Sequence, residues 1–226
     1  MKKFILILFL IIYPINSIAH IGHYSNYNKI EMEIYRNEKL IGYNYYFFSR
    51  KDDITTITNQ IKFSVKILGT TIFQIEGYGE EKYMKDQLIS YNSRTLQNNK
   101  KKFVDLTYNE NTKKFDIKGS SFNGEALTTN VIGNWWNHKI LQADSQISPI
   151  SGSIKEQVVT FIGKEKIELY GKFYDVDHFI LKSKDMTLPK DKRLNFDIWY
   201  DRKNARIIKV SYSRMGNWEY RLKNFE

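Results

Sequence analysis

The sequence contains no cysteine among its 226 residues. This absence excludes disulfide bonds, thiolate metal sites and cysteine nucleophiles. The chain also has no tandem repeat, no low-complexity tract and no linker that would divide it, and beyond residue 13 no apolar run approaches the roughly 20 residues of a membrane-spanning helix. We therefore expect one domain that is stabilised by packing and has no transmembrane span.

The N-terminus has the composition of an export signal. Two lysines follow the initiator methionine, residues 4–13 are apolar, and small residues precede a cut after Ala19. A positive start, a short apolar centre and a small residue at the cleavage position are typical of a secretory signal peptide. We predict a signal peptide at residues 1–19, a single β-rich domain at residues 20–226, and a periplasmic or secreted location.

Positive charge is in surplus. The formal net charge is +10, and removal of the two lysines in the predicted signal peptide lowers it to +8. Such a surplus favours peripheral contact with an anionic envelope surface. The lysines are spread along the chain, and no aromatic and basic signature of a nucleic-acid module is present, so we expect no nucleic-acid partner.

The C-terminal residues 194–222 show the clearest structural pattern. Large apolar side chains alternate with polar ones in three segments: Leu194, Phe196, Ile198 and Tyr200, then Ile208, Val210 and Tyr212, then Trp218, Tyr220 and Leu222. Because successive side chains of a strand point to opposite faces, this period of two predicts three antiparallel strands with one buried face. Turn-forming residues separate the segments at 201–204 and 215–217.

The same alternation recurs over residues 30–117 and 157–181, with turn signals about every eight to twelve residues. We predict an all-β fold of about twelve strands. Sequential antiparallel strands of this number must close or curl, so we expect a single strongly curved antiparallel sheet, a barrel or half-barrel, with one short helical or irregular segment near residues 134–142. A two-sheet β-sandwich is the alternative. Gly42, inside a predicted strand, indicates a bulge or the close approach of another backbone.

The segment Asn134-Trp-Trp-Asn-His138 is the densest mixture of aromatic and polar side chains in the chain. At a barrel mouth it would suit an amphipathic ligand, because binding pockets are mostly apolar with a few placed polar groups. We predict that Trp135, Trp136 and His138 form a pocket mouth, with Tyr200 and Tyr212 as lining. The alternative is that an indole simply fills the core.

Acid–base candidates are His138, Asp144 and His178, and none lies in a hydrolase or metal-site motif. In a strand, Asp177 points away from its neighbour His178, which makes the two poor joint ligands. Asp201 is expected on the wet face of the last three strands. We assign no catalytic residue and expect no cofactor.

His20 and His23 are a candidate metal site. If the signal peptide is cut after Ala19, His20 becomes the N-terminal residue, and its α-amine and imidazole form a bidentate chelate suited to copper. His23 would add a nitrogen. This arrangement resembles the N-terminal half of the histidine brace of copper monooxygenases and periplasmic copper carriers. The alternative is a histidine in a frayed terminus.

Several short motifs together resemble a family of uncharacterised exported bacterial proteins. They are Lys39-Leu-Ile-Gly42, Glu81-Lys-Tyr83, Trp135-Trp136, the turn at residues 144–152, and Trp199-Tyr-Asp201. The resemblance implies a periplasmic curved β-sheet, lipocalin-like or lipoprotein-carrier-like in outline, and it carries over no catalytic residue.

Taken together, these features predict a non-enzymatic exported protein that binds a lipophilic or anionic small molecule in the envelope. Two alternatives stay open. One is a copper-binding protein or metalloenzyme that uses His20, and the other is a structural or partner-binding envelope protein.

Overall fold

The computed structural model describes residues 20–226, and the predicted signal peptide lies outside the described residues. The described strands form one fifteen-stranded sheet in the order β8-β7-β6-β5-β4-β3-β2-β1-β15-β14-β13-β12-β11-β10-β9. None of the helices in residues 20–226 is long and apolar enough to cross a bilayer.

The strands are β1 (Lys29–Arg36), β2 (Lys39–Lys51), β3 (Ile54–Ile67), β4 (Thr70–Met84), β5 (Gln87–Gln97), β6 (Lys100–Asn109), β7 (Lys114–Gly119), β8 (Asn123–Leu127), β9 (Val131–Ile132), β10 (Ser145–Ile147), β11 (Ile154–Leu169), β12 (Lys172–Ser183), β13 (Asn195–Asp201), β14 (Arg206–Ser213) and β15 (Asn217–Phe225). The 3-10 helices are η1 (His20–Tyr24), η2 (His138–Leu141) and η3 (Lys190–Lys192).

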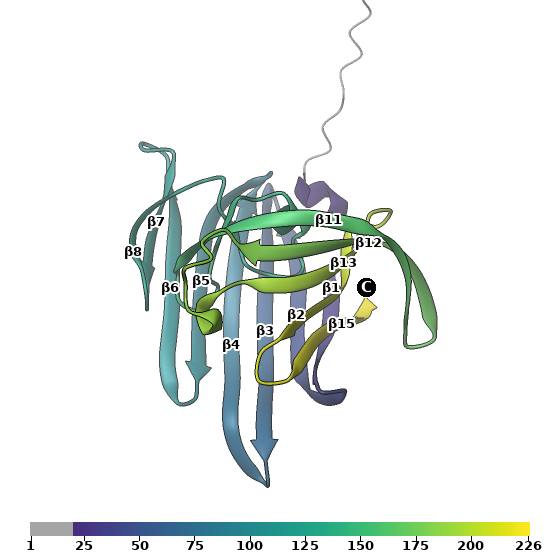
Figure 1. Cartoon of the computed structure of the whole chain (residues 1–226). Coiled ribbons are helices and arrows are strands. Elements are labelled where there is room, and N and C mark those ends of the chain that lie inside the picture. The colour runs from purple at the N-terminus through teal and green to yellow at the C-terminus, as the bar shows by residue number, and fades with distance from the viewer. Residues whose placement is uncertain (1–19) are drawn as a thin grey trace, which may run out of the picture.

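The first strand is the centre of the sheet. β1 pairs with β2 on one side and with the last strand, β15, on the other. One arm of the sheet therefore runs from β2 to β8 and the other from β15 to β9, and the second arm curves round to cross over the first (Figure 1). The predicted single curved antiparallel sheet is confirmed. The β-sandwich alternative is wrong, because hydrogen bonds connect both arms through β1.

The expected count of about twelve strands was too low. Three short strands, β8 to β10, lie outside the ranges in which alternation predicted strands, and β9 pairs with β10 in parallel. β11 is one continuous strand, although its pairing with β12 shifts register between Phe161 and Gly163. The segment predicted as short and helical contains η2.

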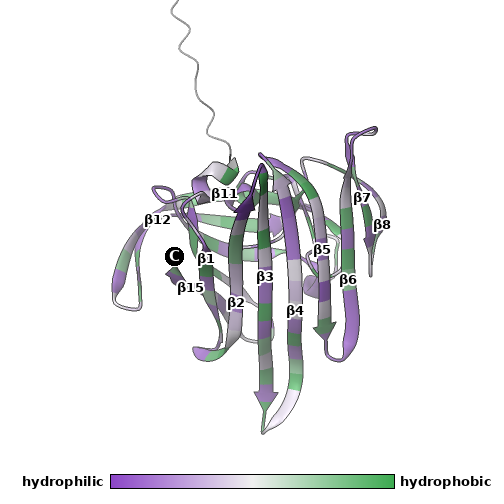
Figure 2. Ribbon diagram, turned by 180° about the vertical axis from the view of Figure 1, so that it is seen from behind, coloured by the Kyte–Doolittle hydropathy of each residue, from purple (hydrophilic) through white to green (hydrophobic). Residues whose placement is uncertain are grey.

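The core lies between the two arms and is built by the alternation that the sequence shows. In β1, Ile30, Met32 and Ile34 are buried while the residues between them are only partly covered. The same striping of apolar and polar residues follows the strands of the first arm (Figure 2). Each fully buried aliphatic side chain of this kind contributes about 1.5–3 kcal/mol through removal of its surface from water.

Gly42 shows both features predicted for it. The register between β1 and β2 shifts next to it, so Ile34 pairs with Gly42 and Tyr35 with Leu40. A Cβ on Gly42 would lie 2.0 Å from the carbonyl oxygen of Lys62. Only glycine allows β2 and β3 to approach this closely.

A second register shift corrects the expectation for Asp201. The pairing of β13 with β14 shifts between Trp199 and Tyr200, so the alternation of buried and exposed positions breaks there. Tyr200 and Asp201 are consequently both buried. Asp201 does not face solvent but accepts a hydrogen bond from the Arg206 Nη2 atom at 3.0 Å.

Candidate functional site

A cavity of about 260 Å³ lies between the two arms of the sheet. Strands β2 to β5 supply one wall, which is mainly polar and includes Asn44, Tyr46, Asn59, Tyr91, Ser93 and Thr95. The segment around residues 133–150 and strands β10, β11 and β13 to β15 supply the other wall, which includes Asn134, Trp135, Gln146, Lys155, Phe196, Tyr212 and Tyr220. The cavity thus combines amides and hydroxyls with aromatic rings.

Hydrogen bonds fix the polar wall. The Asn59 Nδ2 atom donates to the Asn44 Oδ1 atom at 2.6 Å, and the Asn44 Nδ2 atom donates to the Tyr46 hydroxyl at 2.7 Å. That hydroxyl also accepts the backbone N–H of Trp135 at 3.1 Å, which ties the two walls together. Burial raises the pKa of Tyr46 above its usual value, so its hydroxyl is neutral and available as a donor.

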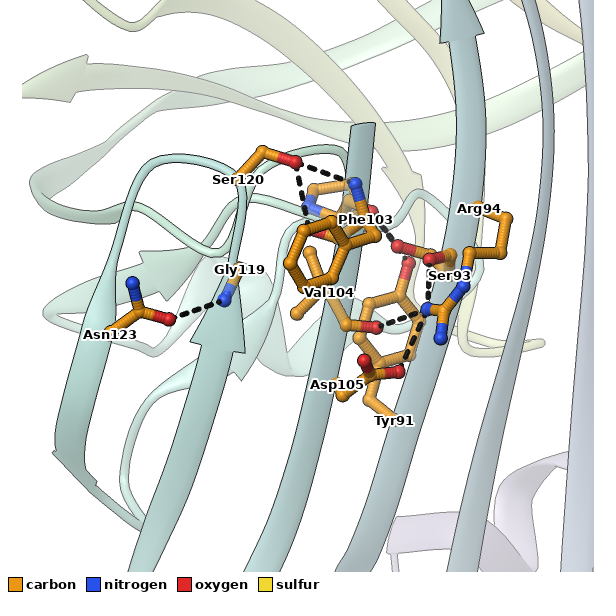
Figure 3. A network of polar contacts seen from close by, with 10 residues as sticks. Tyr91, Ser93, Arg94, Phe103, Val104, Asp105, Gly119, Ser120 and Asn123 are labelled. Atoms are coloured by element: carbon orange, nitrogen blue, oxygen red, sulfur yellow. Dashed lines mark hydrogen bonds and ion pairs between the residues drawn. The ribbon is translucent and has the colours of Figure 1, made fainter. Parts of the chain in front are cut away.

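Side chains along β5 point alternately to the two faces of the sheet, so its polar contacts form one group that faces the cavity and one group on the outer face. The Tyr91 hydroxyl and Ser93 Oγ both donate to the carbonyl oxygen of Pro149, at 3.0 and 2.7 Å. Arg94, the next residue, turns to the other face and pairs with Asp105 at 2.8 Å (Figure 3). The inner pair holds the turn that contains Pro149 against the cavity.

Two cations lie at the cavity wall. Lys155 on β11 and Arg214 after β14 are near enough that Arg214, after the larger effect of burial, lowers the pKa of Lys155. Lys155 Nζ donates to the carbonyl oxygen of Lys192 at 3.2 Å. Within residues 20–226, neither cation forms an ion pair with a carboxylate, and the residues that line the cavity include no Asp or Glu. The cavity therefore offers uncompensated positive charge.

Glu81 is a buried carboxylate that the sequence pattern alone does not mark as a site residue. Its Oε1 atom accepts hydrogen bonds from Asn134 Nδ2 at 2.6 Å and Trp136 Nε1 at 2.9 Å, and its Oε2 atom accepts the Tyr83 hydroxyl at 2.6 Å. Burial raises the pKa of Glu81, against the opposing effect of these three donors. The sequence feature that could have identified Glu81 is its spacing from Tyr83, because residues two apart share one face of a strand.

The predicted pocket residues occupy two places. Trp135 and Tyr212 line the cavity. Trp136, His138 and Tyr200 instead surround Tyr24 of η1: the ring centroids of Tyr24 and Trp136 are 5.0 Å apart, and those of His138 and Tyr200 are 5.4 Å apart. The structure therefore brings three of these five side chains together beside η1 and two at the cavity.

His138 is held by Tyr24. Its Nδ1 atom lies 2.8 Å from the Tyr24 hydroxyl, which also accepts the backbone N–H of His138 at 3.2 Å and donates to the Ala205 carbonyl oxygen at 3.1 Å. Burial, and then the neighbouring charges of His23 and Lys139, lower the pKa of His138 to about 4. The ring is thus neutral at pH 7.

The proposed metal ligands His20 and His23 belong to η1. The His23 ring is exposed and lies edge-on to His138, with ring centroids 5.5 Å apart. The side chain of His20 is outside the described part of the structure. Among the side chains that are described, no three His, Cys, Asp or Glu residues group as metal ligands.

His178 finds its carboxylate partners on neighbouring strands. Its Nδ1 atom contacts Glu165 at 2.7 Å and its Nε2 atom contacts Asp197 at 2.9 Å, while its ring stacks on Trp199. Asp177, as expected, points away, and it pairs with Arg202 instead. His178 therefore belongs to a hydrogen-bonded network on β11 to β13, on the opposite face from the core.

The β11–β12 hairpin extends beyond the rest of the sheet (Figure 1). Exposed apolar side chains lie on it, namely Val158, Phe161, Ile162 and Phe173. This surface is the feature on which the partner-binding alternative depends.

One antiparallel sheet that curves back over a polar cavity defines a β-barrel-like protein. A crystal structure of a β-barrel-like protein of the domain of unknown function DUF1849 from Brucella abortus has this fold: it aligns with a TM-score of 0.58 at 8% identity, over 88% of this chain and 96% of that one. Residues 32–223 match the domain of unknown function DUF6134, and the chain belongs to that family. The expected relation to an uncharacterised β-sheet family is confirmed.

Two further comparisons add little. A DUF1329 family protein from Desulfovibrio piger aligns over 91% of this chain and 88% of that one, at 12% identity, and its TM-score of 0.18 is too low to indicate a shared fold. No curated protein sequence matches the chain.

Proposed function

We propose that the protein is an exported, non-enzymatic envelope protein that binds a small anionic amphiphile in the cavity between the two arms of its sheet. The sequence of residues 1–19 supports export. The observation that carries the ligand class is the presence of Lys155 and Arg214 at a cavity whose lining, within residues 20–226, contains no carboxylate.

The residues that line the cavity suit both the charged head group and the apolar part of such a ligand. The head group, a carboxylate or phosphate, would lie against Lys155 and Arg214, because ammonium and guanidinium groups form charge-assisted hydrogen bonds with these anions. The apolar part would lie against Trp135, Phe196 and Tyr212, whose rings face the same space. Since the volume of about 260 Å³ is at the small end for ligand pockets, we expect a short chain.

The test compares three probes of equal chain length: octanoate, octanol and octyltrimethylammonium. Calorimetric titration of the mature protein should show that octanoate binds, that octanol binds more weakly, and that the cation does not bind. The double variant Lys155→Gln/Arg214→Gln should lose about tenfold or more in octanoate affinity, since each lost charged hydrogen bond costs about 1.5–3 kcal/mol.

The matched control is Lys100→Gln/Lys101→Gln, which removes the same charge from an exposed position on β6. It should bind octanoate as the wild type does. Equal binding of octanoate and the cation, or unchanged affinity in the cavity variant, would refute the proposal. If no probe binds and native mass spectrometry of protein purified from cells shows no retained small molecule, the partner-binding alternative gains instead.

A further inference from the structure

We propose that the ligand of the cavity carries a hydroxyl group on its chain, and that this hydroxyl binds between the phenols of Tyr46 and Tyr91. The inference rests on the proposed function and makes it more specific: the ligand class becomes a short hydroxylated acid rather than any anionic amphiphile. Its head group would lie against Lys155 and Arg214 on one wall of the cavity, while Tyr46 and Tyr91 belong to the opposite wall.

The hydrogen bonds around Tyr46 fix one another's direction. The carbonyl oxygen of Tyr45 can only accept, so the atom of Asn59 that lies 3.0 Å from it must be the Nδ2 donor. The same Nδ2 atom lies 2.6 Å from Asn44, which must therefore present its Oδ1 acceptor to Asn59. The Nδ2 atom of Asn44 is then the one that donates to the Tyr46 hydroxyl at 2.7 Å.

The hydrogen of the Tyr46 hydroxyl is left without an acceptor. Its oxygen receives two donors, Asn44 Nδ2 and the backbone N–H of Trp135, and within residues 20–226 the hydroxyl donates to no other atom. The Tyr46 side chain is 1% exposed and lines the cavity. A buried donor without an acceptor is costly, so an oxygen of the cavity's occupant is the partner that this hydrogen requires.

Tyr91 offers the complementary group. Its hydroxyl hydrogen and that of Ser93 are both used for the carbonyl oxygen of Pro149, so the oxygens of these two side chains can only accept further bonds. Both side chains line the cavity. Burial raises the pKa of Tyr91, and the nearby phenol of Tyr46 acts in the same direction. This wall therefore presents a donor at Tyr46 close to an acceptor at Tyr91.

Glycine leaves the space between the two phenols open. Gly79 on β4 pairs with Asn59 on β3, which in turn pairs with Tyr46 on β2. A Cβ at Gly79 would lie 3.1 Å from the Tyr91 hydroxyl oxygen, which is tighter than an ordinary van der Waals contact. The absence of a side chain thus lets Tyr91 lie over β4 and keeps this part of the cavity free of side-chain atoms.

A hydroxyl group satisfies both phenols. It accepts the hydrogen of Tyr46 and donates its own hydrogen to Tyr91, whereas a carbonyl could only accept. In a pocket without such partners a hydroxyl on the chain weakens binding, because it gives up its hydrogen bonds to water without replacement. Tighter binding of a hydroxylated probe is therefore a specific sign of this pair.

The experiment is calorimetric titration of the mature protein with octanoate and with its 3-, 6- and 7-hydroxy derivatives. At least one of the hydroxy acids should bind about fivefold more tightly than octanoate, as expected for a gained hydrogen bond. The matching oxo acid, which accepts but cannot donate, should bind more weakly than that hydroxy acid. If no hydroxy acid binds more tightly than octanoate, the proposal is overturned.

Tyr46→Phe should remove the preference, so that its affinities for octanoate and for the preferred hydroxy acid agree within about twofold. The ratio is the readout, because this variant also leaves the donors of Asn44 and Trp135 unpaired, which affects both probes alike. Tyr43→Phe is the matched control, since Tyr43 is on the other face of β2, where its ring stacks on Tyr45, and it should keep the wild-type ratio. A preference that survives in Tyr46→Phe would overturn the proposal, and the probes on wild-type protein decide it if that variant does not fold.

This inference and the proposed function fail in different ways. Octanoate binding that depends on Lys155 and Arg214 but gains nothing from a hydroxyl supports the anionic amphiphile and contradicts the hydroxylated ligand. If neither octanoate nor any hydroxy acid binds, both proposals are wrong.

Discussion

The carboxylate of Glu81 accepts the indole N–H of Trp136 at 2.9 Å, across 55 residues of sequence. Asn134 donates to the same oxygen, so the segment that follows β9 is held to β4 inside the fold. A buried carboxylate that binds three donors organises the interior, because each donor would otherwise lose its hydrogen bonds to water without replacement.

Replacement of Glu81 by alanine should therefore be costly. It leaves the donors of Trp136, Asn134 and Tyr83 without their acceptor, and we expect a loss of about 3 kcal/mol or more in the free energy of unfolding. Glu81→Gln keeps the size and one acceptor oxygen and should stay within about 1 kcal/mol of the wild type near pH 5. Urea denaturation measures both, and equal losses in the two variants would contradict the assigned role.

The free energy of unfolding should depend on pH differently in the wild type and in Glu81→Gln. The pKa of Glu81 is raised in the folded state, so the unfolded chain loses this proton first. The contribution of the protonated form to stability is complete below the unfolded pKa and is lost as pH rises through the folded pKa, by about 1.4 kcal/mol per unit of pKa shift. Because Glu81→Gln cannot ionise, its stability relative to wild type should increase over this range. Urea titrations from pH 4 to pH 8 test this prediction. A difference in the free energy of unfolding between the two proteins that stays constant over this range would count against it.

Asp201 and Arg206 form a buried ion pair in which each residue compensates the charge of the other. Among the residues that the structure describes, the Nε and Nη1 atoms of Arg206 are buried without a hydrogen-bond partner. The Arg206 guanidinium lies 3.7 Å from the ring centroid of Phe225. Asp201→Asn should cost about 3 kcal/mol, because it leaves this charge uncompensated. Arg206→Met in the same chain should recover part of the loss. A double-mutant cycle in guanidinium chloride measures the coupling, and additive losses would show that the pair is not coupled.

Gly42 should tolerate no side chain. An alanine Cβ would overlap the Lys62 carbonyl and the Phe63 Cβ, the latter at 2.4 Å, so the backbone of β2 or β3 must move. We expect a loss of about 3 kcal/mol for Gly42→Ala. Gly163→Ala is the control, since a Cβ at that position would have no atom of residues 20–226 within 4 Å beyond its chain neighbours. It should change stability by less than about 0.5 kcal/mol. Comparable melting temperatures in the two variants would contradict this account.

Much of the fold could be predicted from the sequence because strand alternation is a local property. The direction of each side chain follows from the pleat of its own strand, so Ile30, Met32 and Ile34 indicate a buried face without any knowledge of their partners. The prediction failed where the pleat is interrupted. The register shift beside Tyr200 turns Asp201 inward, against the expectation that it faces solvent.

The sequence predicted some of the residues of the candidate sites, but not how their side chains are arranged. Composition and spacing single out Trp135, Trp136 and His138, but they do not show that Trp135 faces the cavity while its two neighbours in the segment pack against Tyr24. Nor do they show that Glu81 is the acceptor for Trp136.

The sequence by itself determined an all-β chain, since the alternation that marks each strand depends on neighbouring residues. Only the tertiary structure decided which side chains meet. Those contacts arise when one arm of the sheet curves over the other, and that curvature brings together residues such as Tyr24 and His138, which are 114 positions apart. Their pairing depends on packing of the whole chain rather than on any local pattern.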